Sequence, residues 1–162
     1  MYEDVFRALN EKGVRYLVAG GVAVVLHGFL RATADLDLMV DFERVNISAF
    51  IEVLKALGYK PRPPVPIEEL GSAESREKWK SEKGMRVFSL FNPEQPQDII
   101  DVFVDEPVSF AQAYVGREQV SLGEISVSVV SVPDLIRLKK IAGREQDMED
   151  IRALNELGDG HE

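Results

Sequence analysis

The chain has 162 residues, a mass of 18.1 kDa and a formal net charge of −9. This length predicts one domain with a sizeable core, and the 45% hydrophobic and 29% charged residues are ordinary for a globular protein. The lack of cysteine excludes disulfides and thiolate metal sites, the two histidines exclude a histidine-rich metal site, and the acidic balance argues against a broad nucleic-acid-binding surface.

The first half of the chain predicts helices that alternate with short apolar strands. The expected helix, strand, helix, strand and helix cover residues 2–12, 14–19, 22–29, 33–40 and 46–57. Glycines mark several of the boundaries: Gly13 stops the first helix, and Gly20-Gly21 turns the first strand into the second helix. Asn46 is the expected N-cap of the third helix, which Gly58 ends.

The segment from Pro61 to Ser72 is rich in proline. Its four prolines prevent regular strand pairing, so the segment is expected to be extended and to lie outside the sheet. A polar helix is expected to follow over residues 73–83. The segment from Pro61 to Ser72 is the best linker or lid candidate of the chain, and with the polar helix it makes up residues 61–84.

The second half predicts further strands and two closing helices. Strands are expected over 85–91 and 98–105, a hairpin that breaks at Gly123 over 117–130, and helices over 131–142 and 145–157. Ser131, Pro133 and Asp134 combine an N-cap, a first-turn proline and a capping-box acid. The predicted fold is α/β (α+β): a mixed β-sheet flanked by helices, in a single domain over 1–162 with C-terminal helices over 131–158.

Three aspartates stand where the predicted strands would bring them together. Residues i and i+2 of a strand point to the same face, so Asp35 and Asp37 are expected to project together, and Asp101 interrupts an apolar face of a later strand. A buried carboxylate needs a cation or must lose its charge. Three of them suit divalent ions, which could align a hydroxyl and a triphosphate. The alternative is that these acids cap loops or pair with arginines such as Arg31 and Arg86.

Gly20-Gly21 precedes these acids at the junction of a strand and a helix. Free N–H groups and the helix dipole favour phosphate at such a junction. The segment lacks the Gly-Lys-Ser/Thr of a Walker loop and the third glycine of a dinucleotide fingerprint. The diglycine alone indicates a tight turn, but together with the acids it predicts a phosphate cradle ahead of a metal-binding pair.

A resemblance to the DNA polymerase β-like nucleotidyltransferase superfamily is carried by AGGVAVVLHGFLRATADLDLMV, residues 19–40. The chain is particularly similar to the small bacterial branch that holds the AbiEii-type toxins and the lincosamide and aminoglycoside nucleotidyltransferases. It matches the pattern of that branch at Gly20, Gly21, Gly28, Arg31, Thr33, Asp35 and Asp37, with Asp101 as the third acid. The C-terminal stretch LIRLKKIAGREQDMEDIRAL resembles the closing helices of the branch, in which a lysine and an Arg-x-x-Asp-type segment recur.

This resemblance implies transfer of a nucleoside monophosphate from a nucleoside triphosphate to an acceptor hydroxyl, with Mg²⁺ and release of pyrophosphate; Mn²⁺ is expected to substitute. Asp35 and Asp37 would hold the metal ions, and Asp101 would hold the catalytic metal and orient or deprotonate the hydroxyl. The implied nucleotide-binding residues are Gly20, Gly21, Arg31, Thr33 and Lys139.

Alternatives remain open for several of these residues. Arg31 would contact phosphate or pair with Asp35, Thr33 is more typical of a structural position, and Lys139 read by itself is a solvated lysine. Asp147 and Asp150 share one face of the last helix. They would pair with Arg144, approach the nucleotide or be solvated.

One basic cluster contains an aromatic residue, Trp79, which could stack on a base. It comprises Arg76, Lys78, Lys80, Lys83 and Arg86, interspersed with acids, and a solvated helix face is the favoured interpretation. We nevertheless expect this helix to border the opening of the carboxylate cleft and to help choose the acceptor or base.

Several functions are compatible with these features. The first is a metal-dependent nucleotidyltransferase, a candidate toxin of a toxin–antitoxin system with an antitoxin as partner, whose acceptor would be RNA, a protein hydroxyl or a small molecule of antibiotic type. The second is a non-catalytic module of the same fold that binds a partner protein, and the third is a metal- or nucleotide-sensing domain. Without a membrane-span-length run or a signal-peptide pattern, no membrane partner is expected, and the expected compartment is the cytoplasm.

Overall fold

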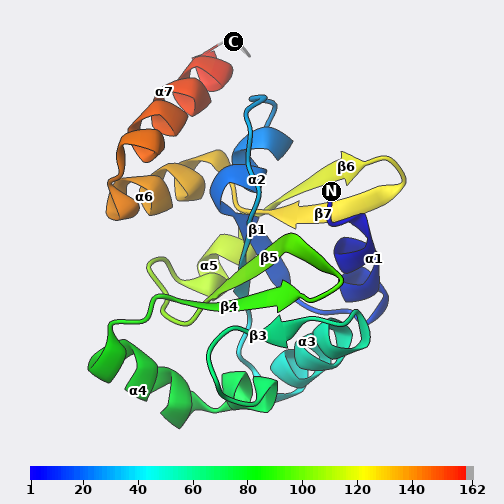
Figure 1. Cartoon of the computed structure of the whole chain (residues 1–162). Helices are drawn as coiled ribbons and strands as arrows, with labels where there is room; N and C mark the ends of the chain where they lie inside the picture. The colour runs from blue at the N-terminus through cyan, green and yellow to red at the C-terminus, as the bar shows by residue number, and fades with distance from the viewer. Residues whose placement is uncertain (160–162) are drawn as a thin grey trace.

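Seven strands form a single mixed sheet in the computed structural model, which describes residues 1–159 (Figure 1). Residues 160–162 of the predicted domain lie outside that range. The strands are β1 (Tyr16–Ala19), β2 (Leu36–Val40), β3 (Lys60–Pro61), β4 (Val87–Asn92), β5 (Gln95–Phe103), β6 (Glu118–Leu122) and β7 (Ile125–Val129). The helices are α1 (Glu3–Glu11), α2 (Gly20–Leu26), α3 (Arg44–Ala56), α4 (Ala73–Lys83), α5 (Phe110–Val115), α6 (Val132–Ala142) and α7 (Glu145–Asp159), with a 3₁₀ helix η1 at Ile67–Gly71.

The order of the strands across the sheet is β3-β4-β5-β2-β1-β7-β6. The central strand β2 pairs antiparallel with β1 and parallel with β5, and β1 pairs parallel with β7. Strands β4 and β5 form an antiparallel hairpin. The predicted mixed sheet is therefore confirmed, and its two acid-bearing strands are direct neighbours.

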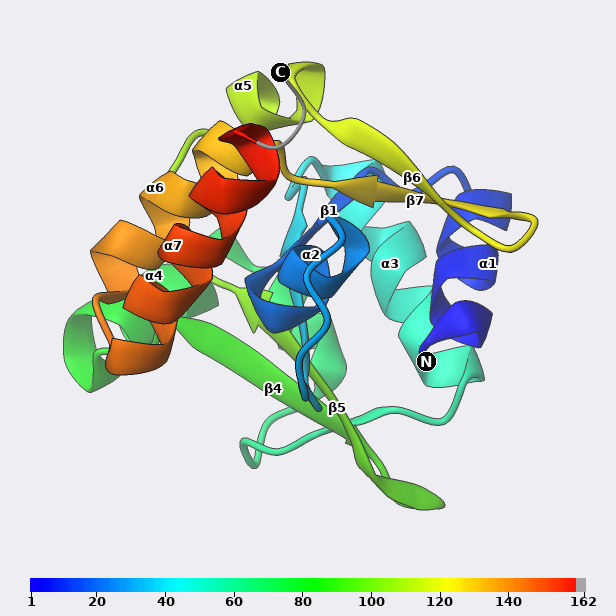
Figure 2. The ribbon, with the colours of Figure 1, turned by 90° about the horizontal axis from the view of Figure 1, so that it is seen from above.

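Helices cover both faces of this sheet. In Figure 2, α1 and α3 lie together on one side of the central strands, and α6 and α7 lie together on the other. The core contains the apolar residues that alternate with the acids along β2 and β5. Leu36, Leu38, Ile100 and Val102 are all fully buried, so the acids at the intervening positions are directed to the opposite face of the sheet.

Several element boundaries differ from the sequence-based expectation, among them those of β4 and β5. Strand β2 begins at Leu36 rather than at residue 33, and α2 begins at Gly20 itself. Asn46 is not the N-cap of α3: Glu43 caps that helix by accepting hydrogen bonds from the backbone N–H groups of residues 45 and 46. Asn46 lies inside the helix and is buried, because its amide bonds the backbone of Arg15 and Asp41.

The proline-rich segment is more ordered than expected. Pro61 belongs to β3, which pairs antiparallel with β4 at the edge of the sheet, so the prediction that the whole segment lies outside the sheet is wrong. An edge strand tolerates a proline because one side of it needs no backbone donor. Residues 67–71 form η1, which packs on α3. Helix α4 follows over the predicted residues.

The hairpin and the start of α6 are confirmed. Strands β6 and β7 pair antiparallel around Gly123, and Ser131 caps α6 by accepting a hydrogen bond from the N–H of Asp134 (3.3 Å). The six-residue helix α5 was not predicted, because it is too short for a helical period to be visible. Among residues 1–159, no helix has both the length and the apolar character needed to cross a bilayer.

Candidate active site

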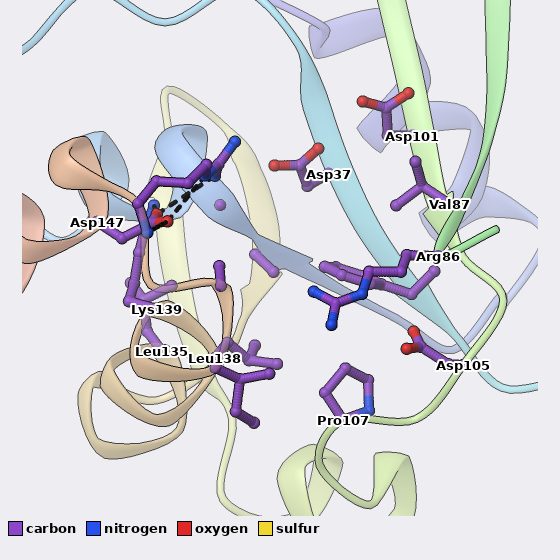
Figure 3. A pocket seen from close by; sticks show the side chains of 16 residues that line it. Asp37, Arg86, Val87, Asp101, Asp105, Pro107, Leu135, Leu138, Lys139 and Asp147 are labelled. Carbon is purple, nitrogen blue, oxygen red and sulfur yellow. Dashed lines mark hydrogen bonds and ion pairs between the residues drawn. The ribbon is translucent and has the colours of Figure 1, made fainter. Parts of the chain in front are cut away.

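The candidate site lies where a row of paired residues crosses the centre of the sheet. Asp37 of β2 is paired in register with Ala19 of β1 on one side and with Asp101 of β5 on the other. Asp101 is paired in turn with Ser89 of β4. Because residues paired in register project to the same face, the two carboxylates emerge next to each other, and Figure 3 shows both at one cleft.

The cleft has a volume of about 330 Å³. The sheet supplies one wall, and α6 with the start of α7 supplies the facing wall, as Figure 3 shows. The charged lining residues are Asp37, Arg86, Asp101, Asp105, Lys139, Arg144 and Asp147, and the larger apolar ones are Val87, Phe103, Pro107, Leu135, Leu138 and Ile141. A cleft of this size, lined by apolar side chains with a few convergent charges, is typical of a small-molecule site.

Asp37 carries a negative charge that the protein leaves largely uncompensated. Burial, and after it the carboxylates of Asp101 and Asp35, raise the pKa of its carboxyl to about 7. Lys139 and Arg144 oppose this shift without cancelling it. None of the ion pairs within residues 1–159 includes Asp37. A bound cation would therefore stabilise this side chain strongly.

Asp101 is held in place by a neighbour on β4. The hydroxyl of Ser89 donates a hydrogen bond of 2.5 Å to Asp101 Oδ1. Burial raises the pKa of Asp101, and this hydrogen bond offsets part of the rise. One oxygen is thus fixed by the protein, while the carboxylate as a whole is more basic than an exposed aspartate.

Asp35 is placed differently from the other two acids. It precedes β2, so the alternation that directs strand side chains does not fix its direction. It does not line the cleft. Within residues 1–159, no three acidic or histidine side chains lie close enough to hold one metal ion. The expectation that three carboxyl groups converge on one point is therefore not met; two of them are brought together.

The two glycines make room for the site. A Cβ atom at Gly20 would lie 1.9 Å from Asp37 Oδ2, and Gly20 has a positive φ of 64°. A Cβ atom at Gly21 would lie 2.5 Å from Thr33 Oγ1 and 2.7 Å from an Arg31 nitrogen. Close approach of site residues thus requires glycine at both positions, whether or not phosphate binds there.

Lys139 and Arg31 are engaged with acids of α7. Lys139 is buried and lies 3.2 Å from Asp147 Oδ1 and 2.8 Å from Asp150 Oδ2. Arg31 lies 3.0 Å from Asp150 Oδ1. Of the alternatives for Arg31, its pairing with Asp35 is replaced by a pairing with Asp150. Asp147 also pairs with Arg144, at 2.8 Å.

Three residues were not predicted as site residues: Asp105 and Arg144, which line the cleft, and Ser89, which bonds Asp101. Ser89 is visible only once the register of β4 and β5 is known, because that register pairs it with Asp101. Asp105 is visible only once the bend after β5 is placed at the cleft. Arg144 was considered only as a partner of the α7 acids. It lines the cleft with its side chain 74% exposed, so it can reach a ligand.

Trp79 is a core residue rather than a base-stacking platform. It is 6% exposed, and its ring stacks on Phe88 with 5.1 Å between centroids. Lys78 and Lys80 pair with glutamates on their own helix. The lining residues within 1–159 include none from α4, although Arg86, just after it, lines the cleft. The solvated-face interpretation of the lysines fits this placement.

Comparisons with known proteins agree with this architecture. A family model described as "Nucleotidyltransferase of unknown function (DUF6036)" matches residues 3–157. A search of curated proteins found no match.

Three solved structures show similarity over most of the chain. The lincomycin-bound lincosamide antibiotic adenylyltransferase LnuA is 17% identical, with a TM-score of 0.58 over 97% of this chain and 98% of its own. ANT(2'')-Ia, in complex with adenylyl-2''-tobramycin, is 15% identical, with a TM-score of 0.58 over 93% and 83%. An antigenic nucleotidyltransferase-like protein from Paracoccidioides brasiliensis is 16% identical, with a TM-score of 0.59 over 93% and 71%. At these identities the similarity shows the fold, which is the expected nucleotidyltransferase fold.

Proposed function

Because this chain belongs to the nucleotidyltransferase family DUF6036, we propose that it transfers a nucleoside monophosphate from a nucleoside triphosphate to an acceptor hydroxyl, with Mg²⁺ or Mn²⁺. The observation that carries the proposal is the pairing of Asp37 and Asp101 in register on neighbouring strands at the cleft. Two partly buried carboxylates without a cation partner are costly to the fold, so a ligand that neutralises them is favoured.

The donor set fits a hard divalent cation. Asp37 and Asp101 offer carboxylate oxygens, which Mg²⁺ prefers over nitrogen or sulfur. Burial first, and the carboxylates of Asp101 and Asp35 second, raise the pKa of Asp37, so a cation there would favour its ionised form. Asp37 and Asp101 would hold the metal, and Asp35, in the segment before β2, would add negative charge near them. The metal would neutralise charge on the phosphates and lower the barrier to displacement.

The chain's own residues would perform the remaining tasks. Asp101 would orient the acceptor hydroxyl and take its proton, since burial raises the pKa of this carboxyl and makes it a better base. The hydroxyl oxygen would form a bond to the α-phosphorus, the bond from that phosphorus to the bridging oxygen would break, and pyrophosphate would leave. Ser89 would keep Asp101 in the required orientation through its hydrogen bond.

Cations on the facing wall would receive the triphosphate. Arg144 is exposed at the cleft. Lys139 lines the same cleft, and its buried ammonium group pairs with Asp147 of α7. Gly20 and Gly21 would let the phosphates approach the backbone, with Thr33 and Arg31 packed behind them. These positive groups would offset the charge that develops on the transferred phosphate.

A binding experiment tests this proposal without knowledge of the acceptor. Thermal unfolding is measured with Mg²⁺, with α,β-methylene-ATP, or with both. We expect the melting temperature to rise with both together, since a ligand at 100 times its Kd adds about 2.7 kcal/mol. Asp37→Asn and Asp101→Asn should lose the rise. Asp98→Asn, which changes an acid on the other face of β5, should retain it; equal stabilisation of all four proteins would refute the proposal.

The acceptor decides the biological role within this proposal. A toxin of a toxin–antitoxin pair would modify RNA or a protein hydroxyl and would have a small regulator encoded next to it. An enzyme of antibiotic type would modify a small molecule. Inspection of the neighbouring gene separates the two roles.

A further inference from the structure

The cleft contains a carboxylate that the proposed chemistry does not use. Asp105 follows β5 and lines the same cleft as Asp101. Its Oδ1 atom is buried and accepts no hydrogen bond from any group within residues 1–159. A buried carboxylate oxygen without a donor costs free energy, so Asp105 is poised to accept a donor from a ligand.

Asp105 lies in the bend that follows β5 and lines the same cleft as Asp101. The N–H of Val104 donates to the carbonyl oxygen of Arg86 (3.0 Å), so pairing with the neighbouring chain extends past the end of β5. Asp105 follows Asp101 by four residues, so their Cα atoms can be at most about 14 Å apart. Figure 3 shows Asp101 next to Asp37, and Asp105 farther along the cleft near Pro107.

The stretch between these two acids is apolar. Phe103 lies between them along the chain, and Leu135 and Leu138 of α6 line the facing wall. A compound held here would contact carbon on both sides and carboxylates at both ends. This environment suits a ring or aliphatic skeleton and disfavours the evenly spaced phosphates of a nucleic acid.

Arg86 is a candidate to neutralise Asp105 within the protein. Both residues line the cleft, and Arg86 is exposed. Among the ion pairs of residues 1–159, none joins Arg86 to Asp105. The carboxylate therefore remains available to a cation from outside the chain.

We propose that Asp105 binds a protonated amine of the acceptor, which is therefore a small compound that carries both an amine and the reacting hydroxyl. This inference rests on the proposed function of the same cleft. The hydroxyl reaches Asp101 when the amine reaches Asp105, so the two groups lie on the order of 10 Å apart. The amine keeps its proton and forms no covalent bond; the hydroxyl oxygen alone is joined to the nucleotide.

The acceptor class is tested with α-labelled nucleoside triphosphates, Mg²⁺ and three fractions of a cell extract: small molecules, RNA and protein. We expect the label to enter small molecules that a cation-exchange resin retains, and to be lost when primary amines in that fraction are acetylated beforehand. Label in RNA, in protein or in uncharged small molecules would overturn the inference while leaving nucleotidyl transfer intact. No label in any fraction, together with no pyrophosphate release, would overturn the proposed function as well.

Variants then test Asp105 itself. In Asp105→Asn, the amount of the small-molecule fraction needed for half-maximal rate should increase about tenfold or more, the loss expected for one charge-assisted hydrogen bond. Glu94→Gln removes an exposed acid in the β4–β5 turn and serves as the control for net charge, with no expected change. An unchanged requirement in Asp105→Asn contradicts the inference. Arg86→Gln could raise the required amount of the fraction as much as Asp105→Asn does, with no further increase in the Arg86→Gln/Asp105→Asn double variant. That result would contradict the inference and assign Asp105 to positioning Arg86.

Discussion

At Gly20 the carboxylate of Asp37 occupies the space that a Cβ atom would need. Gly20 adopts a left-handed φ, and a Cβ atom there would overlap Asp37 Oδ2. Gly13 adopts nearly the same φ, 65°, but a Cβ atom there would have no neighbour within 4 Å. The two glycines thus separate the cost of backbone strain from the cost of displacing Asp37.

Substitution of these glycines tests the packing of the site. Gly13→Ala should lower the free energy of unfolding by about 1 kcal/mol, the cost of a left-handed residue with a Cβ. Gly20→Ala should cost more and should also abolish the stabilisation by Mg²⁺ with α,β-methylene-ATP. Chemical denaturation with and without these ligands measures both effects. If Gly20→Ala costs no more than Gly13→Ala and binds the ligands normally, the contact with Asp37 is unimportant.

The raised pKa of Asp37 gives stability a pH dependence in the metal-free protein. A carboxyl whose pKa is higher in the folded state contributes stability below its unfolded pKa of 3.8, and that contribution is lost as pH rises through about 7. Asp37→Asn should therefore be more stable than the wild type at pH 8 in EDTA, by up to roughly 4 kcal/mol at 1.36 kcal/mol per pKa unit. The difference should vanish near pH 4. Denaturation at the two pH values measures it, and an equal difference at both would contradict this explanation.

Single residues differ in how far a sequence can place them. Asp37 and Asp101 were predictable because each interrupts an apolar strand, a pattern visible in one dimension. The direction of the Asp35 side chain could not be predicted, because it depends on where β2 begins. The strand begins at Leu36, one residue after Asp35. The burial of Lys139 was also unpredictable, because its partners are on another helix.

At the scale of elements, α7 is attached to the domain through charge as well as apolar contact. Its buried face presents Asp147 and Asp150 together with Ala153 and Leu154. Burial alone would raise the pKa values of both acids. Arg144 and Lys139 hold the pKa of Asp147 below the ordinary value. The pKa of Asp150 is held below it by Lys139, Gln146 and Arg31. The network therefore favours the ionised acids.

This network predicts acid-sensitive docking of α7. Groups whose folded pKa is lowered contribute stability above the unfolded value of 3.8, and the contribution is lost as pH falls below that value. Asp150→Asn should lower the free energy of unfolding at pH 7 by about 3 kcal/mol, because Lys139 and Arg31 lose a buried partner. The difference from the wild type should shrink below about pH 4.

The neighbouring exposed acid Glu149 provides the control for that measurement. Glu149→Gln makes the same change of charge one residue away on α7 and should alter stability little. Denaturation of the three proteins from pH 7 to pH 3 gives the comparison. Equal losses in Asp150→Asn and Glu149→Gln would show that net charge, rather than the buried contacts, accounts for the effect.

The sequence predicted the elements whose boundaries are set by turn or capping residues a few positions away. The β6–β7 hairpin breaks at its glycine, and α6 begins with its serine cap, because both features arise within a few residues. Pro61 entered the sheet against expectation, because a tertiary partner, β4, was available at the edge. The cap of α3 shifted to Glu43 because Asn46 found partners on Arg15 and Asp41.

At the scale of the whole molecule, function depends on how the strands are ordered. The parallel pairing of β2 with β5 brings together two acids that are 64 positions apart in the sequence (37 and 101). Helix α6, which comes later in the sequence, supplies the wall of the cleft that faces the sheet. Strand order and register are long-range properties, so local patterns could suggest the mixed sheet but could not assign its neighbours or the contribution of Asp105.

The most direct test of the central claim is coupled detection of nucleotide transfer and pyrophosphate release. The wild type is incubated with α-labelled nucleoside triphosphates, Mg²⁺ and the extract fractions, and labelled product and pyrophosphate are counted in the same reaction. We expect equal amounts of both, abolished by EDTA and reduced by at least about a hundredfold in Asp37→Asn and Asp101→Asn, with Asp98→Asn near the wild type. Undiminished transfer by Asp37→Asn and Asp101→Asn, or no transfer by the wild type with any triphosphate, would contradict the account.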